Sequence, residues 1–107
     1  MSNIDSLGER VQREFPEARV VKTLNTINCE LMVDPGRLAG GVHSVFVSGN
    51  DGDAKATVTG LLHELSHTDV IDLGDITTAR GPEMYLPLWL RLMSSLGTAE
   101  FSIRVVR

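Results

Sequence analysis

Residues 45–74, VFVSGNDGDAKATVTGLLHELSHTDVIDLG, decide the fold class. A β-branched run at each end predicts a strand, and the segment between them has the apolar spacing of a helix. We expect this helix to start near Asp53, and the residues that can cap it are Asn50, Asp51 and Asp53 itself. A strand, a helix and a strand within about 30 residues are typical of a right-handed parallel crossover, so an α/β fold is predicted.

The same segment contains His63, Glu64 and His67 in the HExxH spacing of zinc peptidases, in which two histidines bind the metal and the glutamate is the general base. The apolar stripe of the helix is expected to consist of Ala54, Val58, Leu61, Leu62 and Leu65. Both histidines then lie on the opposite, solvent-facing side, and His67 falls beyond the last helical turn. Since no third ligand can be placed either, we expect no metal site, and a small zinc hydrolase is the third of three functional alternatives.

Further elements are predicted before residue 43. Ser6 and Glu9 stand in the S-x-x-E relation of a capping box, so a short amphipathic helix is expected, ending at Pro16. Its apolar residues, spaced i, i+4 and i+8, are Leu7, Val11 and Phe15. The β-branched run at residues 18–25 predicts a strand, and residues 27–33 predict a turn or two of helix.

After residue 74, Asp75 and Thr77 can cap another helix, whose regular part is expected to begin at Pro82 and to bend at Pro87. One apolar stripe of this helix is formed by Tyr85, Leu88, Trp89, Leu92 and Leu96, and a second face by Leu86, Leu90 and Met93. A chain this small cannot cover both faces, so a subunit interface is expected in addition to core. The alternating apolar residues of 99–106 predict a C-terminal strand.

The predicted strands supply both an expected core and candidate ligand contacts. Burial preferences place five of their residues in the core: Val20, Val21, Val45, Phe46 and Val47. The polar residues at strand ends are Asn25, Thr26, Asp72 and Asp75. Such residues are usually caps and turn formers, but in open α/β sheets ligands also bind at the carboxyl ends of strands.

The composition restricts the classes of partner. The chain has 107 residues, 42% of them hydrophobic and 22% charged, which is ordinary for one soluble domain. Its net charge of −4, without a basic cluster, argues against nucleic acid and an anionic membrane as partners. The single cysteine, Cys29, cannot form an internal disulfide, and neither a signal sequence nor a membrane span is recognisable, so a cytoplasmic location is expected.

Four segments, in this order, resemble one oxidoreductase family. They are FPEARVVKTLNT at 15–26, VFVSGNDGDAKATVTGLL at 45–62, DVIDLGDITTAR at 69–80 and PLWLRL at 87–92. They look like the C-terminal portion of dinucleotide-binding oxidoreductases related to the NADP-dependent deazaflavin-coenzyme reductases, a pattern also found in the cytoplasmic reductase domain of six-transmembrane ferric reductases. The resemblance extends from about Leu7 to the end of the chain, and its most specific part is the combination of K-x-x-N-T, V-F-V-x-G-(D/N)-D and D-x-G-x-(L/I)-x-x-(A/S)-R-x-x-E.

The resemblance implies a fold and a set of contacts. Residues 1–107 would form the C-terminal half of a Rossmann-like doubly wound sheet, with three mainly parallel strands, crossover helices and a C-terminal strand. Asn25 and Thr26 would lie near the nicotinamide. The residues that would line the flavin or deazaflavin side are Ile76, Thr77, Thr78, Ala79, Arg80 and Glu83. At the position of Ser66 the family often has a glycine that ends the helix.

One departure from the family decides the functional prediction. The family's G-x-G-x-x-G motif, whose glycines let the backbone approach the pyrophosphate, is absent from this sequence. We therefore expect a truncated or split NADP-linked oxidoreductase unit that works as a homo-oligomer or with a separate N-terminal half. NADP and a flavin or deazaflavin are the cofactors that the resemblance implies, and whether this chain binds either of them alone is left open. The second alternative is a non-enzymatic oligomerisation or interaction module that binds no cofactor.

Overall fold

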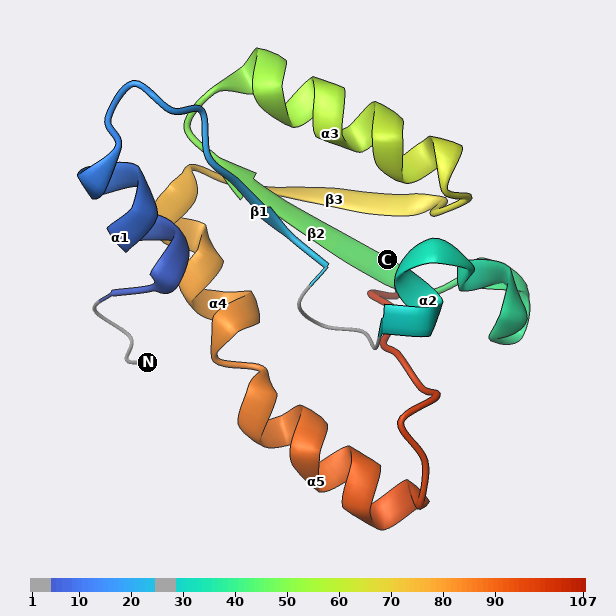
Figure 1. Cartoon of the computed structure of the whole chain (residues 1–107). Coiled ribbons are helices and arrows are strands. Elements are labelled where there is room, and N and C mark those ends of the chain that lie inside the picture. The colour runs from blue at the N-terminus through green and yellow to red at the C-terminus, as the bar shows by residue number, and fades with distance from the viewer. Residues whose placement is uncertain (1–4, 25–28) are drawn as a thin grey trace.

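The computed structural model describes residues 5–24 and 29–107, and it contains a three-stranded sheet in the order β1-β2-β3 (Figure 1). The strands are β1 (Val21–Thr23), β2 (Ser44–Gly49) and β3 (Asp69–Gly74). β2 and β3 are parallel and are joined by α3 (Gly52–Glu64), which confirms the predicted crossover and the α/β class. β1 pairs antiparallel with β2, so the sheet is mixed and the expectation of mainly parallel strands is wrong for this pair.

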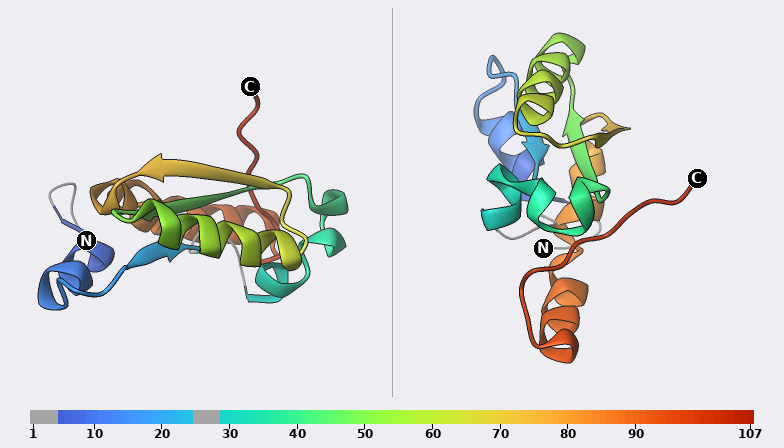
Figure 2. Two further views of the ribbon diagram at one scale, coloured as in Figure 1. Left: turned by 90° about the horizontal axis from the view of Figure 1, so that it is seen from above. Right: turned by 90° about the vertical axis from the view of Figure 1, so that its right-hand side faces the viewer.

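Helices lie on both faces of the sheet (Figure 2). α3 covers one face, on which the core is formed by Leu31, Val45, Val47 and Leu62. Leu31 belongs to α2 (Cys29–Val33), the short helix expected between the first two strands, which is followed by η1 (Pro35–Arg37) and η2 (Ala39–Gly41). Phe46 lies on the other face of β2 and is only half-buried, because successive residues of a strand point to opposite faces. Its expected place in the core is therefore wrong.

The first helix, α1 (Leu7–Glu14), begins with the predicted capping box. The Ser6 Oγ accepts a hydrogen bond of 3.2 Å from the Glu9 backbone N–H and donates one of 3.0 Å to the Glu9 carboxylate. This pairing satisfies one of the N–H groups that every helix leaves free at its start. The helix ends before Pro16, as expected.

The segment after β3 becomes helical earlier than predicted. The Asp75 carboxylate accepts a hydrogen bond from the Thr77 N–H and starts η3 (Ile76–Ala79), which continues into α4 (Arg80–Glu83). The predicted start at Pro82 is therefore wrong. The chain bends at Met84 and Tyr85, and α5 (Leu86–Leu96) begins there with Pro87 in its first turn, where proline is tolerated. None of the described helices is long and apolar enough to cross a membrane.

The predicted C-terminal strand is not formed. Residues 99–107 have no regular structure. Their backbone meets the first residue of β2, where the Ser44 N–H donates a hydrogen bond of 2.8 Å to the Ile103 carbonyl and the Val105 N–H donates one of 2.8 Å to the Ser44 Oγ. β1 already occupies that side of β2 from Val47 to Gly49, so only the beginning of β2 is left for the C-terminal segment. α5 is likewise separated from the sheet (Figure 1) and has no buried residue.

Helix α3 ends in a Schellman motif at Ser66. The His67 N–H donates to the Leu62 carbonyl and the Ser66 N–H donates to the His63 carbonyl, while Ser66 has a φ of 75°. This left-handed conformation is strained for any residue with a Cβ atom. We expect Ser66→Gly to raise the free energy of unfolding by about 1 kcal/mol, measured by denaturant titration. Ser66→Ala keeps the Cβ atom, so it serves as the control and should give no such gain.

The carboxylate of Asp69 anchors the C-terminal segment to the sheet. It accepts hydrogen bonds from the Ser44 hydroxyl and from Arg107, whose Nη2 lies 2.9 Å from Oδ1. The Arg107 guanidinium, followed by the Ser44 hydroxyl, lowers the pKa of Asp69 to about 2. A carboxylate with a lowered pKa stabilises the fold above its unfolded-state pKa and loses this contribution as the pH falls through the folded-state value.

Because the pKa of Asp69 is lowered in the folded state, the stability of the fold changes with pH in the acidic range. We expect the free energy of unfolding to decrease as the pH falls from about 4 towards 2. Asp69→Asn should lower stability at neutral pH and flatten this part of the profile, as followed by denaturant titration at several pH values. An unchanged slope in the Asn variant would assign the acid sensitivity to other carboxylates.

Candidate functional site

The carboxyl ends of β2 and β3 lie at one edge of the sheet, and polar side chains there build the turns. The Asn50 Oδ1 accepts a hydrogen bond of 3.0 Å from the Ile76 N–H. The Asp72 Oδ1 accepts one of 2.8 Å from the Gly74 N–H and another from the Lys55 ammonium. These side chains fix the course of the chain from β3 into η3.

Thr77 and Thr78, two of the predicted contact residues, lie in η3 directly after this edge. The Thr77 backbone N–H and hydroxyl both donate to the Asp75 carboxylate, and these bonds lower the pKa of Asp75, with the hydroxyl as the larger cause. The Thr78 Oγ1 lies 2.7 Å from the Ser48 Oγ and 2.6 Å from the Asp75 carbonyl oxygen. Thr77 is exposed and Thr78 half-buried, so both remain close to the surface at the strand ends.

Arg80 and Glu83, the other predicted contact residues after β3, contact α1. The Arg80 guanidinium forms hydrogen bonds of 2.6 and 2.7 Å to the two oxygens of Glu9, and this pairing lowers the pKa of Glu9 and raises that of Arg80. The Glu83 carboxylate accepts hydrogen bonds of 2.6 and 3.1 Å from the backbone N–H groups of Leu7 and Gly8. Both residues therefore hold the first turn of α1 against α4, and their contact with a cofactor stays a prediction.

Asn25 and Thr26, predicted to lie near the nicotinamide, fall outside the described residues. The strand before them ends at Thr23, which pairs with Val47 in the middle of β2. Because β1 is antiparallel to β2, it runs away from the edge at which β2 and β3 end. The carboxyl end of β1 and the Thr77–Thr78 segment thus belong to different regions of the sheet.

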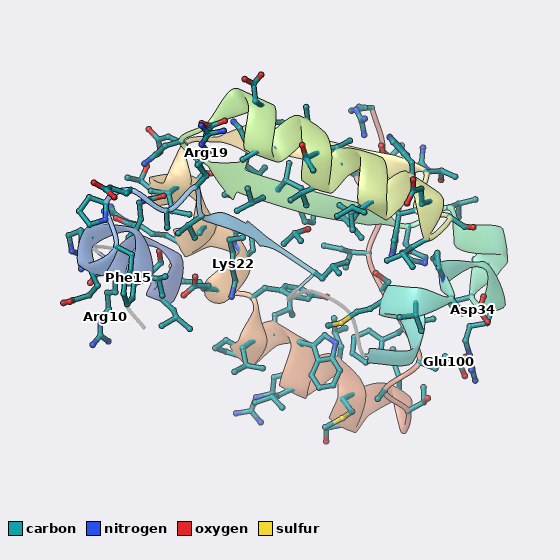
Figure 3. The ribbon with its side chains drawn as sticks, turned by 45° about the horizontal axis from the view of Figure 1, so that its top comes forward. Arg10, Phe15, Arg19, Lys22, Asp34 and Glu100 are labelled. Atoms are coloured by element: carbon teal, nitrogen blue, oxygen red, sulfur yellow. The ribbon has the colours of Figure 1, made fainter. Side chains whose placement is uncertain are left out.

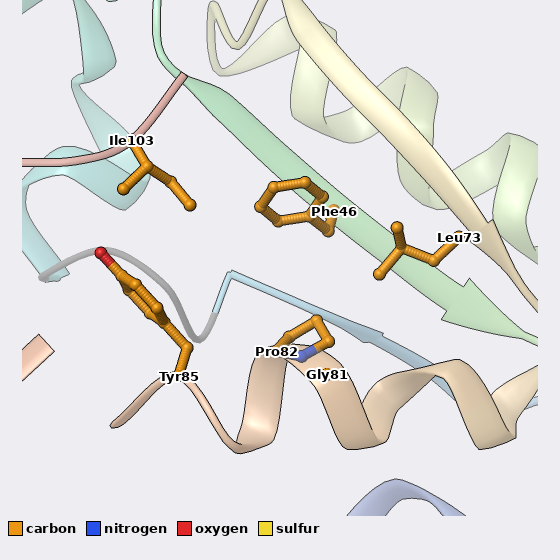
Figure 4. Close-up of a pocket in the computed structure, with 6 residues that line it drawn as sticks. All are labelled: Phe46, Leu73, Gly81, Pro82, Tyr85 and Ile103. Carbon is orange, nitrogen blue, oxygen red and sulfur yellow. The ribbon is translucent and has the colours of Figure 1, made fainter. Parts of the chain in front are cut away.

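An apolar pocket of about 270 Å³ lies on the face of the sheet opposite α3 (Figure 4). Its lining residues come from β2, β3, α4, the turn before α5 and the C-terminal segment, and they are Phe46, Leu73, Gly81, Pro82, Tyr85 and Ile103. Pockets of this kind, largely apolar with few polar groups, are the common form of small-molecule sites. The sheet face and α4 form walls that suit an apolar group.

Tyr85 contributes its aromatic ring to this pocket wall. Its ring stands opposite Phe46 and its hydroxyl end lies on the side of Ile103 (Figure 4). The hydroxyl is buried and has no hydrogen-bond partner among the described residues. Burial raises the pKa of Tyr85, so the phenol stays neutral and can donate a hydrogen bond.

Sequence reasoning missed the pocket, although one signal pointed to it. Phe46 lies between the core residues Val45 and Val47, and successive residues of a strand point to opposite faces. This alternation predicts that Phe46 lies on the other face of β2, where a ligand could contact it. Tyr85 and Ile103 carried no such signal, because they reach the pocket from outside the sheet.

The N-terminus of α3 does not fit a phosphate group. The Asp51 Oδ1 accepts a hydrogen bond of 2.8 Å from the Ala54 N–H, and Asp53 adds a second carboxylate in the first turn. A bound phosphate would need these N–H groups and would be repelled by both carboxylates. Arg19, whose guanidinium lies 3.4 Å from the Asp51 carboxylate, is placed beside this turn (Figure 3). Its charge is already paired with Asp51, so the turn after β2 lacks the features of a pyrophosphate site.

The HExxH residues do not share a helix face, because α3 ends at Glu64. His63 is exposed as expected, but His67 is only 2% exposed and its predicted solvent-facing position is wrong. Beyond the Schellman turn the His67 ring folds inward, and its Nε2 lies 2.7 Å from the Met32 carbonyl oxygen. In the described part of the chain, no three His, Cys, Asp or Glu side chains form a cluster that could hold a metal ion.

The chain is similar to a protein of known structure from Arthrobacter sp. FB24, described as a "putative F420 dependent NADP-reductase". The two share 70% sequence identity with a TM-score of 0.95. The similarity covers 96% of this chain and 46% of the Arthrobacter protein, so this chain spans about half the length of that protein. No protein-family model and no curated protein matches the chain. At this identity, the chain is a relative of about half of the Arthrobacter protein and shares its fold over that half.

Proposed function

We propose that this chain is the C-terminal, Rossmann-like part of an NADP-linked oxidoreductase that transfers hydride between NADP and a deazaflavin or flavin. The observation that carries the proposal is the 70% identity to the Arthrobacter protein over 96% of this chain. It is supported by the K-x-x-N-T and D-x-G-x-(L/I)-x-x-(A/S)-R-x-x-E motifs in the sequence. The contacts proposed for the cofactors are Asn25, Thr26, Thr77, Thr78, Arg80 and Glu83.

The two cofactors fit this chain unequally. A flavin or deazaflavin ring is flat and largely apolar, which suits the apolar pocket. The pyrophosphate of NADP finds neither a G-x-G-x-x-G loop nor a free helix N-terminus after β2. The proposed role of this chain is thus to bind the ring and exclude water from it, while the dinucleotide is bound by residues outside it.

Hydride transfer is chemistry that the cofactors themselves supply when bound. The residues of this chain need only hold the ring in place. Phe46, Leu73, Pro82 and the ring of Tyr85 would pack on it. Thr77 and Thr78 would border the site from the edge at which β2 and β3 end.

The test compares the isolated chain with a joined protein, in which the part of the Arthrobacter protein that this chain does not cover is fused ahead of Met1. We expect the joined protein to bind NADPH and to transfer hydride to a deazaflavin, followed by absorbance. The isolated chain should not bind NADPH tightly. Tight NADPH binding by the isolated monomer, or a folded joined protein that binds both cofactors without transfer, would contradict the proposal.

The second candidate function is a non-enzymatic oligomerisation module, and the surface of α5 favours it. Arg91 is the single charged residue of this helix, and four of its leucines are exposed: Leu86, Leu88, Leu90 and Leu96. Exposed apolar surface of this kind often marks a protein interface. Two results together would support this alternative. Light scattering should show that the isolated chain is a folded oligomer and that Leu88→Glu dissociates it. Neither the isolated chain nor the joined protein should bind either cofactor.

A further inference from the structure

Helix α1 carries its apolar side outward. Leu7 and Val11 of α1 and its C-cap residue, Phe15, recur at i, i+4 and i+8, and each is exposed: Leu7 by 54%, Val11 by 39% and Phe15 by 63%. The residues of α1 that are buried are instead Gly8 and the charged Glu9. An amphipathic helix on the surface of a globular protein normally buries its apolar stripe. Two questions follow: which contacts hold α1 in this orientation, and what the exposed stripe binds.

Polar contacts fix this orientation. Glu9 is paired with Arg80 through two short hydrogen bonds, and Glu83 accepts both of its hydrogen bonds from the first turn of α1. Gln12 holds the following loop, with its Nε2 2.6 Å from the Ala18 carbonyl oxygen and its Oε1 3.1 Å from the Val20 nitrogen. Turning the stripe inward would break all of these contacts, so the polar side of α1 keeps the stripe on the outside.

The position of α1 in the topology indicates what the stripe faces. α1 leads into β1, which pairs with β2 on one side and has no described strand on the other (Figure 1). In a β-α-β unit the helix packs on the sheet and leads into a strand that runs parallel to the strand before the helix, and the succession of α1 and β1 matches the second part of such a unit. The stripe of α1 and the open side of β1 thus lie where such a sheet would continue.

We propose that the Leu7, Val11 and Phe15 stripe and the open side of β1 form one surface that binds the dinucleotide-binding half of the enzyme, a parallel sheet with the glycine-rich loop. The inference rests on the proposed function, which it deepens by naming the surface of contact. The expected partner of this surface corresponds to the part of the Arthrobacter protein that this chain does not cover, which is more than half of that protein's length. A second copy of this chain is the competing occupant.

The test uses a double variant, Val11→Gln with Phe15→Gln, in both the isolated chain and the joined protein. Glutamine keeps the helix propensity and removes the apolar surface. The matched control is Leu61→Gln with Leu65→Gln on α3, because these leucines are exposed by 54% and 38% on the other face of the sheet. Thermal unfolding gives the Tm of each protein, and light scattering gives its size.

We expect the Val11→Gln, Phe15→Gln variant to change the Tm of the isolated chain by less than about 2 °C and to lower that of the joined protein by about 5 °C or more. The control should change neither by more than about 2 °C. Equal effects in both proteins would overturn the inference, as would an isolated dimer that the α1 variant converts to monomers. Hydride transfer by the joined protein is measured separately. If the double variant lowers the Tm as expected but the unaltered joined protein does not transfer hydride, the proposed function alone is contradicted. If the joined protein transfers hydride but the double variant does not lower its Tm, the α1 surface alone is contradicted.

Discussion

Replacement of Leu62 by alanine is expected to lower the free energy of unfolding by about 2–5 kcal/mol, whereas the same change at Leu61 should cost no more than about 0.5 kcal/mol. The two leucines are neighbours on α3. Leu62 is 2% exposed and packs with Leu31, Val45 and Val47, whereas Leu61 is 54% exposed. Removing the Leu62 side chain loses its transfer free energy and leaves a cavity in the core between α3 and the sheet.

Urea titration of both variants checks this expectation, with circular dichroism at a single temperature as the signal. Native domains are stable by only about 5–15 kcal/mol. The loss expected for Leu62→Ala should therefore lower the urea midpoint of this variant strongly and leave part of it unfolded near room temperature. The Leu61→Ala variant controls for the loss of a leucine from the same helix. Equal losses at the two positions would mean that α3 does not pack on the sheet through Leu62.

The apolar spacing of α3 predicted the helix correctly but only part of its buried face. Leu62 is buried and Val58 is partly buried, while Leu61 and Leu65, which the predicted stripe also included, are exposed. The helix is rotated so that Lys55 also faces the sheet, where its ammonium lies 3.1 Å from both the Asp72 Oδ1 and the Gly74 carbonyl oxygen. A periodicity of apolar residues does not count such a polar contact, and so it places the centre of the buried face incorrectly.

Local signals predicted the elements better than their pairing. The capping box at Ser6 and the β-α-β spacing of residues 44–74 depend on neighbouring residues, and both are present in the structure. The antiparallel direction of β1 depends on how the chain returns to β2 through α2, η1 and η2, which no pattern in β1 itself records. The C-terminal segment has the alternation of a strand, but it lacks a free partner along most of β2.

The sequence predicted which chain segment borders the candidate site, but it did not predict the pocket. The resemblance pointed to residues 76–83, which do follow the carboxyl end of β3, but Arg80 and Glu83 in this segment contact α1. The pocket is lined by residues from several separate segments, and its existence depends on where α4 and the C-terminal segment pack. Such a cavity is a property of the tertiary packing, so residue types in one segment could not have revealed it.

Replacement of Gly81 by leucine is expected to weaken binding of a deazaflavin to the joined protein by at least about tenfold, a loss of about 1.4 kcal/mol or more, and to leave NADPH binding unchanged. Gly81 lies in α4 at the pocket, and a Cβ added there has no heavy atom within 4 Å. The backbone at Gly81 thus has room for a Cβ atom, and a leucine at this lining position is expected to take up part of the space that the ring would need. Leucine also favours a helix over glycine by up to about 1 kcal/mol, so the variant should fold at least as stably.

Titration of the joined protein with each cofactor, followed by fluorescence, measures this effect. Gly60→Leu is the matched control, because Gly60 lies in α3 on the other face of the sheet and a Cβ there also meets nothing within 4 Å. Tyr85→Phe removes a buried hydroxyl and keeps the ring that lines the pocket, so it should leave deazaflavin binding nearly unchanged. If Gly81→Leu binds the deazaflavin as tightly as the unaltered protein does, the ring lies outside this pocket, because a filled pocket cannot also hold it.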